Sequence, residues 1–144
     1  PLTLDETKSL TSESIKFIAQ SIQERDSNGI KSLYSPGSDH AFWQCVESTN
    51  NRGWIHGGGV ALSSVIIAWH CGEGLTQLIK DLDLCQVFWR PAQLGLSKQH
   101  LELSLLSTKT FFSDVDNGRD IKSILRDNPI QGNRFEELWD FLQA

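Results

Sequence analysis

The pattern of apolar and polar positions predicts helices near both ends of the chain and one buried helix in its middle. Residues 11–25 place apolar side chains at positions i, i+3, i+4 and i+7, which lie on one face of an amphipathic helix. Residues 60–71 are apolar nearly all round, which is typical of a buried helix, and two glycines follow as its stop. Residues 135–142 repeat the one-face spacing, so we expect a closing helix there with Asn133 as its cap.

Between the buried helix and the closing helix the pattern is more typical of β-strands. Leucines alternate with polar residues over 100–108, which predicts a half-buried strand. Residues 75–90 are expected to form a long strand, either bulged or covered on both faces, and residues 110–115 the next one. The pattern leaves 41–48 and 120–127 open between a strand and a short helix. The order of elements therefore favours an α+β domain.

Composition narrows the class of protein without fixing its function. The 144 residues are 39% hydrophobic and 22% charged, which is typical of one globular domain with a sizeable core. The net charge of −5, without basic clusters, argues against a nucleic-acid partner. The longest wholly apolar run, 65–69, is far shorter than the roughly 20 residues that span a bilayer. We therefore expect a single cytoplasmic domain over 1–144 with no membrane partner.

A glycine-rich loop before the buried helix carries the most informative motif. Residues 50–58 read NNRGWIHGG, and residues 90–95 read RPAQLG. Together they resemble the signature of the phenylacetate-type hotdog thioesterases, in which an Asn, a Gly and His-Gly-Gly lead into the central helix and Arg-Pro-Ala follows on a strand. The similarity covers about 41–116. It implies a hotdog fold, in which an antiparallel sheet wraps the central helix, here with additional N- and C-terminal helices.

The resemblance implies a thioester hydrolase that acts as a homodimer or tetramer. Its substrate would be the thioester of an acyl-CoA or of an acyl-carrier protein, with no metal and no resident cofactor. The thioester carbonyl needs preorganised donors for the charge that develops on its oxygen, and free amides at a helix start supply them. The implied catalytic residues are Asn50, His56, Gly57 and Gly58, and Ser64 is added to them as a nearby polar side chain. The implied substrate contacts are Trp54, Gly59, Ser63 and Arg90.

The chain departs from the family at the residue that usually acts as base. In the family a carboxylate stands nine residues after the His, but Val65 occupies that position and residues 60–71 contain no Asp or Glu. Ser63 and Ser64 are the nearest polar side chains. Two alternatives to hydrolysis therefore remain open, a non-catalytic acyl-binding protein and a protein-interaction module.

Other chemistry-bearing residues favour plainer interpretations. Cys45 lacks the local signature of a cysteine nucleophile. His70 and Cys71 are neighbours that point about 100° apart on a helix, which is a poor geometry for a dyad. The aspartates Asp114, Asp116 and Asp120 lack the spacing of a calcium loop and are expected to be solvated turn residues. We expect the tryptophans to lie in the core, in an interface or along an acyl pocket.

Overall fold

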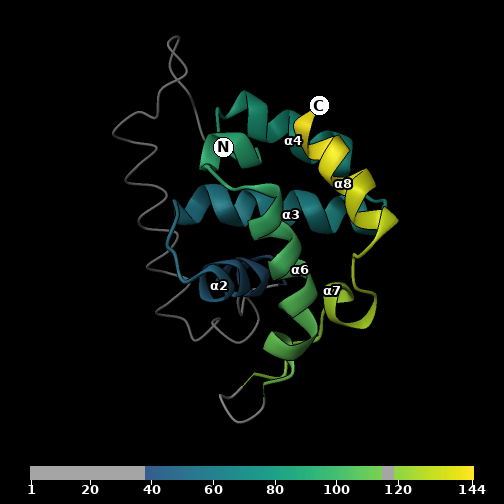
Figure 1. Cartoon of the computed structure of the whole chain (residues 1–144). Coiled ribbons are helices and arrows are strands. Elements are labelled where there is room, and N and C mark those ends of the chain that lie inside the picture. Colours follow the sequence, from purple (N-terminus) through teal and green to yellow (C-terminus); the bar gives the residue numbers. More distant parts are fainter. Residues whose placement is uncertain (1–37, 115–118) are drawn as a thin grey trace, which may run out of the picture. The chain divides into compact units, whose positions relative to one another are not determined.

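The computed structural model describes residues 38–114 and 119–144, and every element in these ranges is a helix (Figure 1). The helices are α2 (Ser38–Asn50), α3 (His56–Cys71), α4 (Leu75–Leu84), α5 (Pro91–Leu94), α6 (Lys98–Phe112), α7 (Ile124–Asp127) and α8 (Asn133–Gln143). The structure is 71% helical, and its described ranges contain no strand. The predicted α+β hotdog fold with its antiparallel sheet is therefore wrong.

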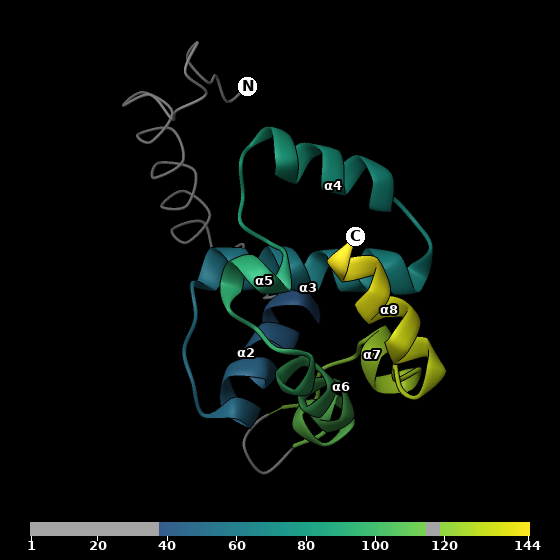
Figure 2. The same cartoon turned by 45° about the horizontal axis from the view of Figure 1, so that its top comes forward.

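Helix α3 is packed against several other helices, and it confirms the predicted buried helix. Its side chains Leu62, Val65 and Ile66 are buried. Helix α2 packs on one side of α3 and α4 lies on the other (Figure 2). The helix ends at Gly72, whose φ is 76° and whose N–H donates to the carbonyl of Ala68. That left-handed conformation favours glycine, so the predicted glycine stop is confirmed.

Helix α6 replaces the strand predicted over 100–108. Its buried residues are Leu101, Ser104, Leu105, Thr108 and Phe112, which share one face of a helix. Two of them are polar, and this hides the helical spacing in the sequence. Their burial costs little, because the Ser104 hydroxyl donates to the carbonyl of His100 at 2.7 Å and the Thr108 hydroxyl to that of Leu105 at 2.7 Å.

Helix α4 replaces the first part of the long strand predicted over 75–90. Leu75, Leu78, Ile79 and Leu82 follow the i, i+3, i+4, i+7 spacing of a helix and pack against the core. None of the residues of α4 is fully buried. The alternation near its end, which favoured a strand, covers too few residues to oppose this longer helical pattern.

The remaining predictions have mixed outcomes. Residues 41–48 belong to α2, 120–127 contain the short helix α7, and the closing helix is confirmed as α8, with Gly132 rather than Asn133 as its N-cap. The strand predicted over 110–115 is wrong, because its first three residues end α6. The helix predicted over 11–25 lies outside the described residues, and the single domain over 1–144 stays a prediction. Within the described ranges no helix is long and apolar enough to cross a membrane.

Candidate functional site

Three glycines occupy the first turn of α3, and core packing requires two of them. A Cβ on Gly59 would lie 1.8 Å from the indole of Trp43, and one on Gly58 would lie 2.4 Å from the carbonyl oxygen of Phe88. A Cβ on Gly57 would meet nothing within 4 Å. Contacts within the protein therefore explain why residues 58 and 59 are glycines. Of the three glycines, only Gly57 has room for a side chain.

His56 lies beside the first turn of α2. Its imidazole stands edge-to-face with that of His40, with ring centroids 5.6 Å apart. His40 Nδ1 is 3.2 Å from Asp39 Oδ1, and the hydroxyl of Ser64 donates to Asp39 Oδ2 at 3.2 Å. The carboxylate thus stands between the imidazole and the hydroxyl. In a serine triad the imidazole stands between the other two groups, so this cluster is not arranged to activate Ser64.

Asp39 ties the start of α2 to α3. Burial alone would raise the pKa of Asp39, but the hydrogen bonds from the backbone and ring of His40 and from Ser64 outweigh it and lower the pKa below 3.8. The carboxylate is therefore ionised at neutral pH and acts as a hydrogen-bond acceptor.

The two serines of α3 lie too far along the helix to share a site with Gly57. The Ser63 hydroxyl is buried and donates to the carbonyl of Gly59 at 2.9 Å, while that of Ser64 also lies 3.1 Å from the carbonyl of Val60. Seven residues separate Ser64 from Gly57, about 10 Å along the helix axis. A nucleophile must approach to about 3–3.5 Å, so Ser64 cannot attack a carbonyl held by the Gly57 amide.

Asn50 and Trp54 take part in helix packing. Asn50 Nδ2 donates to the Ser104 hydroxyl at 3.0 Å and to the carbonyl of His100 at 3.3 Å, which fastens the end of α2 to α6. Trp54 lies edge-to-face with Trp43 at 5.8 Å and with His100 at 5.7 Å between ring centroids. The contacts of these two predicted site residues therefore join α2 to α6.

Arg90 is engaged by a carboxylate of its own chain. Its Nη1 and Nη2 donate to the two carboxylate oxygens of Asp83 at 2.9 and 3.2 Å, and its guanidinium lies 4.4 Å from the ring centroid of Trp89. The hydrogen bonds from Arg90 and from Trp89 Nε1 lower the pKa of Asp83. A coenzyme A phosphate would have to displace this bidentate pair to bind Arg90.

The structure also shows the surroundings of the aspartates considered for a metal site and of the cysteine considered as a nucleophile. Asp114 pairs with Arg119 at 3.2 Å and Asp120 pairs with Arg126 at 2.9 Å, while Asp116 lies outside the described residues. The part of the chain that the structure describes holds no group of three or more His, Cys, Asp or Glu that could hold a metal ion. Burial raises the pKa of the Cys45 thiol to about 11, so this thiol stays protonated.

The reactivity of the three cysteines tests which of them the structure buries and which it exposes. Cys71 and Cys85 are exposed and Cys45 is buried, and all three are free. We expect a disulfide reagent to modify two thiols rapidly in the native protein at mildly alkaline pH and the third only after unfolding in guanidinium chloride, because Cys45 is shielded and mostly protonated. The released thiolate chromophore measures the count. Cys45→Ala should keep two fast thiols, and three fast thiols in the native protein would contradict the structure.

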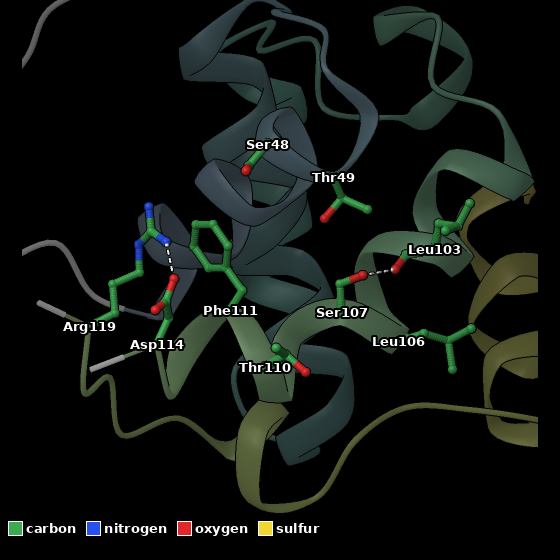
Figure 3. Close-up of a pocket in the computed structure, with 9 residues that line it drawn as sticks. All are labelled: Ser48, Thr49, Leu103, Leu106, Ser107, Thr110, Phe111, Asp114 and Arg119. Atoms are coloured by element: carbon green, nitrogen blue, oxygen red, sulfur yellow. Dashed lines mark hydrogen bonds and ion pairs between the residues drawn. The ribbon is translucent and has the colours of Figure 1, made fainter. Parts of the chain in front are cut away.

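A groove between α2 and α6 was missed by the sequence prediction. It has a volume of about 590 Å³ and is open to solvent. Figure 3 shows the side chains that line it. Leu103 and Leu106, 45% and 58% exposed, give its apolar surface. The other lining residues are Ser48 and Thr49 of α2, Ser107, Thr110 and Phe111 of α6, and Asp114 and Arg119. The groove therefore has an apolar strip, a rim of hydroxyl groups and one charged end.

The charged end of the groove is held by local contacts. Arg119 Nη1 lies 3.2 Å from Asp114 Oδ2, and its guanidinium lies 4.1 Å from the ring centroid of Phe111. Ser107 donates its hydroxyl proton to the carbonyl of Leu103 at 2.8 Å, so its oxygen is left to accept a hydrogen bond. The sequence signal for the groove was the pair Leu103 and Leu106. These leucines lie away from the buried face of residues 98–112 only if this segment is a helix.

No family model, no curated protein and no solved structure matches this chain. The resemblance to the hotdog thioesterases thus rests on the two short motifs alone. In the described part of the chain, Gly57 and Gly58 lie in the first turn of α3, Arg-Pro-Ala begins the short helix α5, and no strand lies beside either.

Proposed function

We propose that this helical domain is a protein-docking module, in which the groove between α2 and α6 receives one face of an amphipathic helix. The observation that carries the proposal is the pair Leu103 and Leu106, which present two large apolar side chains to solvent on successive turns of α6. In helix-in-groove recognition the apolar face of a helix lies in an apolar groove, and these two leucines supply apolar surface to the groove. It corresponds to the interaction-module alternative of the sequence analysis.

The energetics of the groove favour a partner that covers it. Fully burying an exposed leucine is worth about 1.5–3 kcal/mol, so covering the exposed parts of Leu103 and Leu106 offers roughly 1–3 kcal/mol in total. The hydroxyls of Ser48, Thr49 and Thr110 surround this strip. An apolar centre with a polar rim is the usual arrangement of a protein–protein contact.

Acyl-thioester hydrolysis and acyl binding stay predictions from the sequence motif. Of the residues predicted for that site, Ser64 is hydrogen-bonded to Asp39 and Arg90 to Asp83, and Ser64 lies about 10 Å along the helix from Gly57. A panel of acyl-CoA substrates tests the enzyme directly, and turnover that is lost in His56→Ala would favour hydrolysis over docking.

Peptide selection against the full chain tests the docking function. We expect a displayed peptide library to yield amphipathic helices whose binding is at least about tenfold weaker to Leu106→Ser, because this change removes an exposed apolar anchor and leaves the core intact. Leu84→Ser is the matched control, since Leu84 is 59% exposed on α4, away from the groove. Affinities are measured by fluorescence anisotropy. Peptides that bind Leu106→Ser as tightly as the wild type would contradict the proposal.

A further inference from the structure

We infer that the helix received by the groove is α6 of a second copy of this chain, packed antiparallel to α6 of the first around a twofold axis. The inference rests on the proposed docking function and names its partner. The evidence for it is the arrangement of apolar and charged residues along the outer face of α6.

The apolar residues of this face are spaced to interlock with themselves. Place the twofold axis level with the midpoint between residues 105 and 106. The two copies of Leu106 then lie about 1.5 Å apart in height, on either side of the axis. Leu103 of each copy lies level with the interval between Leu106 and Thr110 of the other. Each leucine therefore enters a gap in the facing helix, as side chains of packed helices do.

The charges on the same face are complementary at the same register. Glu102 and Lys109 are exposed and seven residues apart, so they lie on one flank of the leucine pair, two turns from each other. Neither belongs to an ion pair in the described part of the chain, and Glu102 also acts on Lys98 of its own helix, whose pKa it helps to raise. The twofold axis brings Glu102 of one copy level with Lys109 of the other, twice in the dimer. Such self-complementarity is what an isologous contact requires.

The expected dimer is weak. Two leucines and two exposed charge pairs cover less surface than the roughly 800 Å² per partner of a standard interface. We therefore expect a dissociation constant well above the micromolar range.

Sedimentation equilibrium of the full chain over a range of concentrations tests the apolar part of the inference. The wild type is expected to show a monomer–dimer equilibrium. Leu106→Glu should weaken the dimer at least about thirtyfold, because a carboxylate would be brought beside its symmetry copy. Leu84→Glu, an equally exposed change on α4, should leave the dissociation constant unchanged. Thermal unfolding by circular dichroism checks that each variant is folded.

Charge reversal tests the orientation. Glu102→Lys or Lys109→Glu alone should each weaken the dimer about three- to tenfold, because each places like charges at the same level twice. The double variant Glu102→Lys, Lys109→Glu should restore the dissociation constant of the wild type. A double variant as weak as the single ones would overturn the antiparallel arrangement.

The outcomes separate this inference from the docking function. A wild-type chain that stays monomeric up to about 1 mM, with selected peptides still bound in the groove, overturns self-association and keeps docking. A dimer that Leu106→Glu leaves intact overturns the inference, because it uses another surface. Peptides that bind Leu106→Ser unchanged contradict docking itself.

Discussion

Gly59→Ala is expected to lower the free energy of unfolding by about 3 kcal/mol, the upper end of what one added methyl group costs in a packed core. The new Cβ would lie 1.8 Å from the indole of Trp43, which is fully buried and cannot turn away. Relief would require α2 and α3 to separate. Denaturant unfolding followed by tryptophan fluorescence measures the loss.

Gly57→Ala is the matched control, two residues earlier in the same helix. Its Cβ would meet nothing within 4 Å, and alanine is the better helix former by about 0.5–1 kcal/mol. This variant should therefore be as stable as the wild type or more so. Equal losses at Gly57 and Gly59 would show that the glycines serve a common role unrelated to the contact with Trp43.

Trp43→Ala is expected to cost about 3–5 kcal/mol, because it empties the largest fully buried position of the described core. The indole packs against Gly59 and lies edge-to-face with Trp54 at 5.8 Å between centroids. Within the described residues its Nε1 has no hydrogen-bond partner, so Trp43→Phe should be milder and loses no hydrogen bond. Denaturant unfolding by circular dichroism gives the free energies.

The two changes should be coupled. In the Trp43→Ala background the methyl group of Gly59→Ala has space to occupy, so it should cost much less than in the wild type. We expect a coupling free energy above about 1 kcal/mol in the double-mutant cycle. Additive losses would show that α3 cannot accept a side chain at residue 59 for a reason other than Trp43.

Sequence patterns predicted the helices whose buried positions are mostly apolar. The centre of α3 is apolar nearly all round apart from Ser63 and Ser64, and α8 buries Phe135, Leu138 and Leu142 on one face, so both were predicted. In α6 the buried stripe contains Ser104 and Thr108, which satisfy their hydroxyls within the helix. Their burial could not be known in advance, and Leu101, Leu103 and Leu105 then looked like one side of an alternating strand.

The candidate site failed for a similar reason. Glycines that allow a ligand to approach and glycines that allow an indole to approach look the same in a sequence, and Gly58 and Gly59 are of the second kind. Arg90 could be predicted as a free cation only while Asp83 was placed on a strand. The groove became visible only once α6 was known to be a helix, because its two exposed leucines follow from that periodicity.

The shallow packing of α4 makes the stability of the domain uneven. None of its residues is fully buried. In the described part of the chain, α3 is the one helix with which α4 makes more than marginal contact. A segment with few buried side chains opens at a lower free energy than the core. We therefore expect α4 to open before α2, α3 and α6 unfold, so that the groove formed by α2 and α6 should persist when α4 is detached.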